Sequence, residues 1–396
     1  MKWTNKGHEF DQIGEKLATV KSLYFYGIGG HAREIAELMD YGKKWFDLNV
    51  FYVDRNEEVR ERGFCGKEIM SPETFFEKVR DDNDYLVISC PLGEVGEEIK
   101  SYVVGHGISD EDVVLGYDFL FTLIPLYFLY KYDMVFFTSE NIVPSSACNL
   151  NCRECLNFNP YIDIPVIYSL DEIKRNVDLF FNAVDLIYRF QVTGGEPLLY
   201  PHFAEVITYI HENYGDRIFR LETVTNGTVI PDDRICDCIV KNDVHVFLDD
   251  YTLSLPYESK ETRRRIVEKF EKYNIKYFDN YVDRWFKIYP ARCEKKKEEL
   301  VDFFTKCANP WSTVENGCIS ACNYELYAQK AGLVEGDSTD FYSLENFQKD
   351  KKRELVEFRL RFNTKGYTSF CRKCAGFSVI NNDLYYPAIQ IERGKR

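Results

Sequence analysis

Residues 148–155 read CNLNCREC, which places Cys148, Cys152 and Cys155 at the spacing C-x3-C-x2-C. Three thiolates on one loop can hold three irons of a [4Fe-4S] cluster and leave the fourth iron without a protein ligand. Zinc is the alternative, but a structural zinc ion normally takes four ligands, and no nearby histidine completes this set. The loop therefore predicts an iron–sulfur cluster with one open coordination position, which is what a catalytic cluster needs.

A second motif, GGEP at residues 194–197, directly follows a predicted strand at 186–192. Gly194 and Gly195 would expose backbone for the close approach of a ligand. Glu196, which precedes Pro197, supplies a carboxylate that can receive an ammonium group. The motif predicts a binding loop at the end of a strand.

Strands and helices alternate around the two motifs. The capping-box sequence at 169–172 (SLDE) begins a helix. Apolar runs predict strands that alternate with helices, at 134–137, 186–192, 218–224, 244–248 and 275–281. Such alternation implies parallel βαβ units. Where such units close into a barrel, the active groups lie at the carboxyl ends of the strands.

Together, CNLNCREC and GGEP closely resemble the motifs of the radical S-adenosylmethionine (SAM) superfamily. The resemblance implies a partial (β/α)6 TIM-type barrel, which would accommodate one strand beyond the five predicted. It also implies that Cys148, Cys152 and Cys155 hold a [4Fe-4S] cluster. The open iron would be chelated by the amino and carboxylate groups of SAM, and the 194–197 motif would contact the methionine amino group.

Polar residues at the predicted strand ends are further candidates. Asn226 lies in the stretch TNG at 225–227, which looks like the superfamily's third-strand motif. Asp249 lies where many relatives have a serine that contacts the cofactor, so this sequence departs from the pattern there. The candidates for proton abstraction are Glu222, Asp249, Asp250 and Tyr251. The alternative for each is a strand-end side chain that caps a helix or faces water.

Four cysteines near the C-terminus form a second set. Cys307 and Cys322 enclose a glycine in the pattern C-x9-G-x4-C, and Cys371 and Cys374 follow as C-x2-C. Four thiolates can ligate a [4Fe-4S] cluster or a zinc ion, and the spacing does not choose between them. The pattern resembles the twitch domain, a shortened SPASM extension of radical SAM dehydrogenases, which implies one auxiliary [4Fe-4S] cluster.

Two more thiols, Cys293 and Cys318, flank this second set. Either is a candidate hydrogen-atom donor or substitute ligand, and a structural thiol is the alternative. A thiol that returns a hydrogen atom to the substrate would give epimerisation. Loss of an electron to an auxiliary cluster would instead give oxidation.

The N-terminal segment carries a different motif. The stretch GIGGHA at 27–32 follows a predicted strand at 22–26 and precedes a predicted helix, the G-x-G-x-x-A arrangement of a dinucleotide-binding turn. Gly27 permits the turn, Gly29 lets a ligand approach, and Asp54 ends the next strand, where an acid could accept a ribose hydroxyl. Backbone N–H groups at the helix start would favour a phosphate. A ligand-free Rossmann-like fold is the alternative.

Residues 20–116 resemble the N-terminal domain of bacterial nucleotide-sugar acetyltransferases, which helps to hold a UDP-sugar. Three or four strands are predicted, only half of a full dinucleotide fold, so NAD is not expected.

Composition limits the remaining possibilities. The chain has 396 residues and a formal net charge of −14, which argues against a general nucleic-acid backbone binder. Thirteen cysteines without a signal-peptide-like start predict a reducing, cytoplasmic compartment. The most apolar run, 119–130, is too short for a membrane span and is interrupted by Pro125.

The predicted fold is α/β: a Rossmann-like half domain (1–118), a connector (119–133), a radical SAM partial barrel (134–290) and a twitch-like cluster domain (291–396). The predicted function is radical SAM oxidation or epimerisation of a sugar or nucleotide-linked sugar, with an external one-electron donor such as flavodoxin or ferredoxin. A ribosomal-peptide maturase is the alternative. A non-enzymatic zinc-binding scaffold is the alternative from another class.

Overall fold

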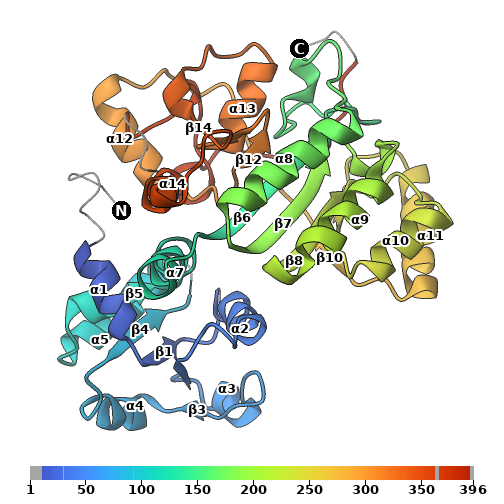
Figure 1. The fold of residues 1–396 in the computed structure, drawn as a ribbon. Coiled ribbons are helices and arrows are strands. Elements are labelled where there is room, and N and C mark those ends of the chain that lie inside the picture. The colour runs from blue at the N-terminus through green and yellow to red at the C-terminus, as the bar shows by residue number, and fades with distance from the viewer. Residues whose placement is uncertain (1–10, 30, 92, 362–364, 393–396) are drawn as a thin grey trace. The chain divides into compact units, whose positions relative to one another are not determined.

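The computed structural model describes residues 11–29, 31–91, 93–361 and 365–392. These residues form two compact units, one that ends at Thr138 and one that begins at Ser139 (Figure 1). Each unit is built on its own sheet. No helix in the described ranges has the length and apolar character needed to cross a bilayer.

The first unit is a five-stranded parallel sheet in the order β3-β2-β1-β4-β5. The strands are β1 (Ser22–Tyr26), β2 (Asn49–Val53), β3 (Ile69–Met70), β4 (Tyr85–Ser89) and β5 (Val113–Leu115). The helices are α1 (Asp11–Thr19), α2 (Ala32–Tyr41), α3 (Glu57–Arg62), α4 (Pro72–Val79) and α5 (Glu94–Gly105). Every residue of β1 is buried, so this strand lies at the centre of the core. The two-residue strand β3 extends the predicted sheet to five strands.

The predicted connector is helical. Gly116–Asp118 (α6) and Phe119–Leu123, a π-helical turn, lead into α7 (Ile124–Tyr132). Leu120, Leu126 and Phe128 are fully buried, and Tyr130 Oη donates to Asp11 Oδ1 of α1 (2.9 Å). The apolar run therefore forms part of the core of the first unit.

The second unit is an eight-stranded sheet in the order β10-β9-β8-β7-β6-β12-β13-β14. The five strands predicted from the sequence are β6 (Phe136–Ser145), β7 (Leu186–Gly194), β8 (Ile218–Thr225), β9 (His245–Asp250) and β10 (Tyr277–Tyr281). The intervening helices are α8 (Leu170–Ala183), α9 (Phe203–Tyr214), α10 (Asp233–Lys241) and α11 (Glu258–Tyr273) (Figure 1). The predicted capping box is present, because Ser169 Oγ accepts from Glu172 N and Glu172 Oε2 accepts from Ser169 N.

The C-terminal segment continues this same sheet. Strand β12 (Thr313–Glu315) pairs parallel with β6, and β13 (Cys318–Ser320) and β14 (Phe341–Ser343) follow antiparallel. Its helices are α12 (Lys297–Lys306), α13 (Asn323–Lys330) and α14 (Lys352–Arg359). Strand β15 (Leu384–Tyr385) returns to pair with β11 (Trp285–Phe286), just beyond β10. The described parts of the predicted barrel and cluster domain thus share one sheet and one compact unit.

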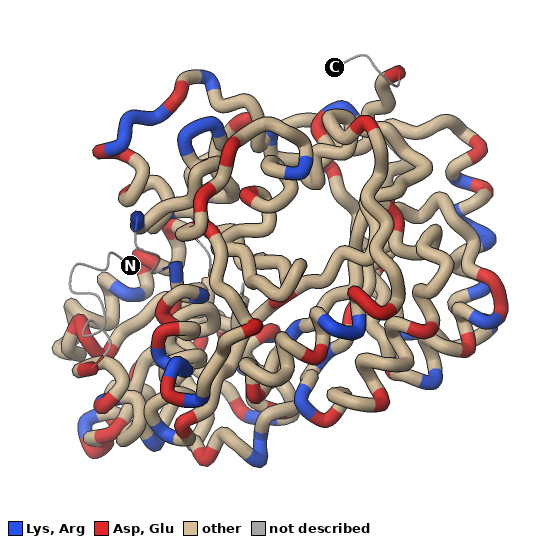
Figure 2. The backbone as a smooth tube through the Cα atoms, turned by 45° about the horizontal axis from the view of Figure 1, so that its top comes forward, with Lys and Arg blue, Asp and Glu red and all other residues tan. Residues whose placement is uncertain are grey.

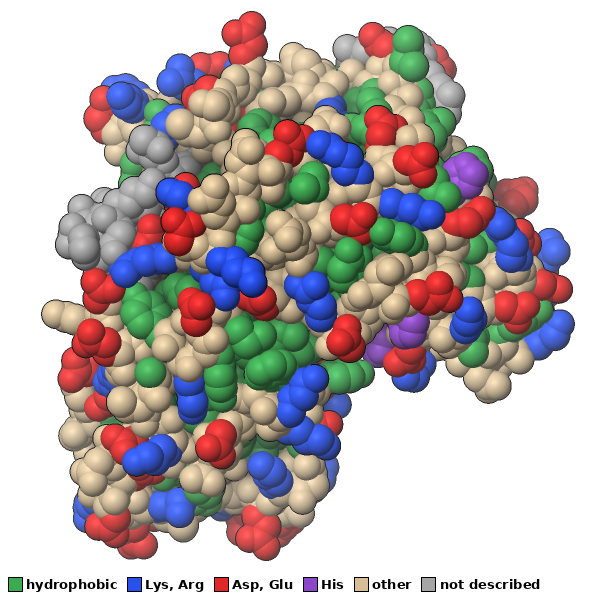
Figure 3. All heavy atoms as spheres, viewed as in Figure 1, with side chains coloured by type: hydrophobic (Ala, Val, Ile, Leu, Met, Phe, Trp, Pro, Cys, Tyr) green, Lys and Arg blue, Asp and Glu red, His purple; other side chains and the backbone are tan. Residues whose placement is uncertain are grey.

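Charged residues of both signs are interspersed along the backbone (Figure 2). On the face shown in Figure 3, Lys and Arg side chains also lie among Asp and Glu.

Candidate active site

The three-cysteine loop directly follows β6, at the carboxyl edge of the parallel strands. Burial raises the pKa of Cys148 to about 11 and that of Cys152 to about 12, and the negative charge of Cys155 adds to both shifts. Burial also raises the pKa of Cys155. All three cysteines line the same cavity. A bound metal would supply the positive charge that deprotonates such thiols.

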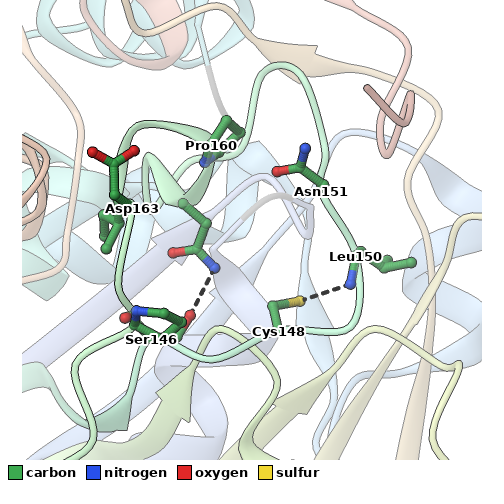
Figure 4. Close-up of a pocket in the computed structure, with 9 residues that line it drawn as sticks. Ser146, Cys148, Leu150, Asn151, Pro160 and Asp163 are labelled. Carbon is green, nitrogen blue, oxygen red and sulfur yellow. Dashed lines mark hydrogen bonds between the residues drawn. The ribbon is translucent and has the colours of Figure 1, made fainter. Parts of the chain in front are cut away.

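Hydrogen bonds reach these sulfurs as well. Leu150 N donates to Cys148 Sγ (3.4 Å; Figure 4), and Gln390 Nε2 donates to Cys152 Sγ (3.3 Å). Among the described residues, no three His, Cys, Asp or Glu side chains form a ready-made site for a single metal ion. The loop offers three gathered thiols with N–H donors on sulfur, and this donor set fits a [4Fe-4S] cluster.

The GGEP motif lies against the cysteine loop. Gly195 N donates to Ser145 O (3.0 Å), and Glu196 N donates to Ala147 O (2.9 Å). A Cβ atom at Gly195 would lie 2.3 Å from Ala147 O, and one at Gly194 would lie 2.4 Å from Ser145 O. The glycine backbone was predicted to meet a ligand, and both glycines do line the cavity described below. The glycines first of all let the two motif backbones touch.

Glu196 links the motif to the next strand end. Its Oε1 accepts from Leu198 N (3.2 Å) and Thr225 Oγ1 (2.9 Å), and its Oε2 accepts from Asn226 N (2.8 Å). The side chain is buried, and burial raises the pKa of its carboxyl to about 7. The sequence suggested an ammonium partner for this carboxylate. In the structure it is already bonded to three protein donors, and Pro197 beside it begins a short 3-10 helix.

A cavity of about 460 Å³ opens at this edge of the sheet, a size suited to a small-molecule site. The cavity is lined by cysteines of the 148–155 loop, by glycines of the 194–197 motif and by polar residues at the strand ends. Aromatic and basic side chains complete the lining. The lining includes Cys148, Cys152, Cys155, Gly194, Gly195, Asn226, Asp249, Tyr251, Asn280, Arg189, Arg284, Phe247, Trp285, Trp311 and Phe377. All of these residues belong to the second unit.

Asp249 is the strand-end acid that lines the cavity. Its carboxylate accepts hydrogen bonds from Tyr251 Oη and from Asn280 Nδ2, the latter at 2.6 Å. Burial raises the pKa of Asp249, although these two donors and Arg263 oppose the shift. Tyr251 is also buried, and burial raises its pKa well above the usual value. The pair can hold and pass a proton beside the cluster cysteines.

The other two acidic candidates do not line this cavity. Glu222 is fully buried and accepts hydrogen bonds from Arg189 Nε (2.8 Å) and Arg220 Nε (2.5 Å). Asp250 forms an ion pair with Arg263 (3.5 Å). Carboxylates held by guanidinium groups are poor proton acceptors, so this geometry favours a structural role for both.

The second set of cysteines also comes together. Burial raises the pKa of Cys322 to about 11 and that of Cys371 to about 12, and Cys307 adds to both shifts. Burial raises the pKa of Cys374 well above its usual value, and the negative charges of the other three thiols add to this shift. Their sulfurs have hydrogen-bond partners at 3.2 Å: Asn309 Nδ2 on Cys322, Thr368 Oγ1 on Cys371 and Gly376 N on Cys374. Four gathered thiols with such partners fit a fully ligated cluster or a zinc ion.

Cys293 and Cys318, the two thiols that flank the second cysteine set in sequence, lie outside the cavity. Cys293 is exposed, in a segment whose neighbour Ala291 N donates to Lys373 O (2.8 Å). Cys318 begins β13, opposite Glu315 and Ser343. Neither thiol lines the cavity, so the structure gives neither of them a path to a substrate there.

The glycine turn of the first unit borders a separate pocket of about 500 Å³. Gly27 has a positive φ of 79°, as the turn requires, and a Cβ atom at Gly29 would meet open space. The lining includes Tyr26, Gly27, Gly29, Asp54, Arg55, Glu98 and Tyr102.

The described backbone N–H groups of this turn are not arranged to bind a phosphate, contrary to the prediction. Ile28 N donates to Asp54 Oδ2 (2.8 Å), so the acid expected to meet a ribose instead binds the turn itself. Gly29, His31 and Ala32 also donate their N–H groups to backbone carbonyls. The backbone donors of these four described residues are thus bonded within the protein, where a phosphate was predicted to meet them.

Several site residues were missed by the sequence reasoning. Asn280 ends the fifth predicted strand, so the strand-end rule could have identified it. Arg189 lies in the interior of β7, and Arg284, Trp285 and Trp311 lie beyond the barrel strands, where no motif marks them.

Comparison with family models identifies residues 142–283 with the Radical SAM superfamily. GTP 3',8-cyclase 1 of Mycobacterium tuberculosis is 32% identical over 89 residues, which cover 22% of this chain and 24% of that protein. GTP 3',8-cyclase 3 of Mycobacterium bovis is 37% identical over 89 residues, 22% of this chain and 23% of that protein. The chain thus spans about a quarter of the length of these curated relatives.

Solved structures also overlap with the chain. Native anSMEcpe with bound AdoMet has a TM-score of 0.40 at 15% identity, covering 64% of this chain and 93% of that chain. BtrN in complex with AdoMet and 2-DOIA has a TM-score of 0.37 at 14% identity, covering 63% of this chain and 98% of that chain.

Proposed function

Residues 142–283 form a radical SAM superfamily domain, and from this premise we propose that the chain is an enzyme that abstracts a hydrogen atom from a C–H bond of a nucleotide-linked sugar. The cofactors of such a domain are a [4Fe-4S] cluster and SAM. The observation that carries the proposal is the cavity of about 460 Å³. It brings the three cluster cysteines together with a buried proton-holding pair, Asp249 and Tyr251.

When bound, the reduced cluster and SAM supply a 5'-deoxyadenosyl radical, which removes hydrogen from an unactivated C–H bond. Cys148, Cys152 and Cys155 would hold this cluster. The residues that line the cavity would orient the substrate carbon and keep water away from it. The aromatic side chains Phe247, Trp285 and Trp311 supply dry walls for that purpose.

The charges that line the cavity favour an anionic substrate. Arg284 contributes a guanidinium group, whereas Arg189 is paired with Glu222. Among the described lining residues Asp249 is the one carboxyl, and burial raises its pKa. Arg284 is held over the ring of Tyr386, 3.9 Å from the ring centroid. Guanidinium and aromatic groups together suit a phosphorylated, ring-bearing molecule. The curated relatives are named for GTP, which also supports a nucleotide.

The substrate proposal has an alternative. A ribosomal peptide with an acidic side chain would also meet Arg284.

Asp249 is the proposed proton acceptor. If the product is a ketone, the substrate carbon loses a hydrogen atom and one electron, and the attached hydroxyl gives its proton to Asp249 while the C=O bond forms. Tyr251 and Asn280 hold the carboxylate in place through their hydrogen bonds. Epimerisation would instead require a hydrogen donor on the opposite face of the substrate, and the predicted thiols Cys293 and Cys318 do not line this cavity, which favours oxidation.

The second cysteine set is proposed to bind an auxiliary [4Fe-4S] cluster of the twitch type, which when bound supplies a one-electron acceptor. Cys307, Cys322, Cys371 and Cys374 would be its four ligands. Phe377, three residues after the last of these cysteines, lines the cavity. This proximity supports oxidation over epimerisation.

The domain plan is proposed as predicted, with a Rossmann-like unit at 1–118, the connector at 119–133, the radical SAM barrel at 134–290 and the cluster domain at 291–396. The pocket beside Gly27, Gly29 and Asp54 is proposed as a separate ligand site that belongs to the first unit alone. Flavodoxin or ferredoxin in the cytoplasm would deliver the electron.

A substrate panel tests the proposal. Reduced enzyme and SAM are incubated with nucleotide-sugars, free sugars and peptides, each deuterated at candidate carbons. We expect deuterium to reach 5'-deoxyadenosine from a nucleotide-sugar alone. Arg284→Gln should raise KM for that substrate about tenfold or more, which is the typical cost of losing one charge-assisted hydrogen bond. Deuterium transfer from a peptide alone would contradict the substrate class.

A further inference from the structure

The end of the described chain meets the cysteine loop. Gln390 forms an isolated β-bridge with Cys152, and Ile391 N donates to Asn151 O (3.0 Å). Arg153 N donates to Ile389 O (2.8 Å). Cys152 and the residues on either side of it are therefore aligned by backbone bonds to a segment more than 200 residues away in sequence.

This junction is buried as well as hydrogen-bonded. Ala388 is fully buried and packs in one apolar cluster with Cys152 and Tyr251, to which Leu150 and Trp285 add partly buried surface. A positive φ of 54° at Ala388 turns the chain into the bridge. The tail is thus held at a defined place beside one thiol and beside the proton-holding pair.

Both the oxygen and the nitrogen of the Gln390 side-chain amide form hydrogen bonds. Its Oε1 accepts from Asn151 N (2.8 Å), and its Nε2 donates to Cys152 Sγ (3.3 Å) and to Ala388 O (2.7 Å). The amide is fixed at both ends, so its orientation is set: the N–H group faces the sulfur.

The three cluster cysteines obtain their hydrogen bonds in different ways. Cys148 accepts from Leu150 N within its own loop (3.4 Å) and from Asn226 Nδ2 at the end of β8 (3.7 Å). The backbone of Asn157, Phe158 and Asn159 opposes the rise in the pKa of the Cys155 thiol. The side-chain donor that reaches Cys152 is Gln390, which lies 238 residues later, so the C-terminal tail serves this sulfur.

We propose that Gln390 sets the reduction potential of the SAM-binding cluster through its N–H···S bond to Cys152. This inference rests on the proposed function, because it assumes that Cys148, Cys152 and Cys155 hold a [4Fe-4S] cluster. Hydrogen bonds to cluster sulfurs raise the reduction potential, since they stabilise the additional negative charge of the reduced state. One electron enters and leaves the cluster, and no covalent bond changes. Gln390 is a positioning residue that acts through Cys152.

Redox titration followed by electron paramagnetic resonance tests this role in the full-length, anaerobically reconstituted protein. Gln390→Leu keeps much of the side-chain volume but removes the donor. At a fixed potential near the wild-type midpoint, we expect the ratio of reduced to oxidised SAM-binding cluster to fall about tenfold. For a one-electron couple this corresponds to a midpoint about 59 mV lower.

Asn151→Ala is the matched control. It removes another side-chain bond of the same junction, from Asn151 Nδ2 to Ile391 O (2.9 Å), and leaves the donor on sulfur in place. Its midpoint should equal that of the wild type. Electron–nuclear double resonance in D₂O should show the same set of exchangeable deuteron couplings in the wild type and in Asn151→Ala, and one coupling fewer in Gln390→Leu, which keeps the donors on Cys148.

Equal midpoints for Gln390→Leu and wild type would overturn the inference, and so would equal shifts in Gln390→Leu and Asn151→Ala. If Gln390→Leu assembles no cluster, Gln390→Glu takes its place in the same titration. Loss of the cluster in both variants while Asn151→Ala retains it would also contradict a tuning role. A wild-type protein that binds no [4Fe-4S] cluster would instead count against the proposed function.

Discussion

The Cα of Gly195 lies so close to the backbone of Ala147 that a Cβ atom on it would be 2.3 Å from the Ala147 carbonyl oxygen. The neighbouring amide of Glu196 donates to the same carbonyl at 2.9 Å. Two motifs that are nearly 50 residues apart in sequence therefore meet backbone to backbone at the mouth of the cavity. The geometry of the cluster loop depends on this contact.

Gly195→Ala should damage the cluster loop. Since the obstructing atoms are backbone oxygens, either the loop or the motif must move, at a cost of about 1–3 kcal/mol in unfolding free energy. We expect less iron per chain after reconstitution and a lower melting temperature. Gly105→Ala is the control, because a Cβ atom there meets nothing within 4 Å. Equal iron content in both variants would show that the contact is dispensable.

Glu196→Gln should separate the motif from the strand end at Asn226. The wild-type carboxylate accepts from Leu198 N, Thr225 Oγ1 and Asn226 N. An amide offers only one acceptor oxygen, so at least one buried donor loses its partner, at about 1–3 kcal/mol. Calorimetry should show SAM binding weakened about tenfold or more. Unchanged SAM affinity and unchanged stability would contradict this linking role.

Asp249→Asn tests the proton acceptor. Loss of a positioned acid or base typically costs about 10²–10⁴ in rate, so kcat should fall by that factor. Cleavage of SAM without substrate should continue, because the cluster loop is untouched. Tyr251→Phe removes one hydrogen bond to Asp249 and should have a smaller effect on kcat. A Tyr251→Phe variant that is slower than Asp249→Asn would reverse the two roles.

The fold was predictable where local signals agree with the global arrangement. Hydrophobic periodicity and helix caps identified the five strands from β6 to β10 and the Ser169 capping box, because these depend on neighbouring residues. The joining of β12 to the far side of β6 depends on pairing between Thr313 and Asn141, which no local pattern encodes.

The site was predictable only in part, for the same reason. Cys148, Cys152 and Cys155 share one loop, so their spacing reveals their grouping. The roles of Glu196 and Glu222 depend on partners from other strands, and the sequence suggested chemistry where the structure shows buried hydrogen bonds. Gln390 carries no motif at all, since its importance comes from a bridge to Cys152 across 238 residues.

Glu140 gives the second unit a pH dependence. The side chain is fully buried, with Ser312 Oγ as a donor, and burial raises the pKa of its carboxyl to about 8. The folded chain therefore holds this proton more tightly than the unfolded chain, where the pKa of a glutamate is about 4.3. The contribution to stability is complete below about pH 4.3 and is lost as the pH rises through about 8.

Glu140→Gln should remove this dependence. Urea unfolding at pH 6 and pH 9 should show a smaller difference in unfolding free energy for the variant than for the wild type. If the free energy of unfolding of the wild type changes between pH 6 and pH 9 by the same amount as that of the variant, the assignment is wrong.

The central claim is that Cys148, Cys152 and Cys155 hold the cluster at which SAM is cleaved. Anaerobically reconstituted protein should be brown, contain about eight irons per chain from two four-iron clusters, and form 5'-deoxyadenosine when reduced with SAM. The variant with all three cysteines replaced by Ala should keep about four irons and form none. Deoxyadenosine from that triple variant, or a colourless wild-type protein that contains only zinc, would contradict the account.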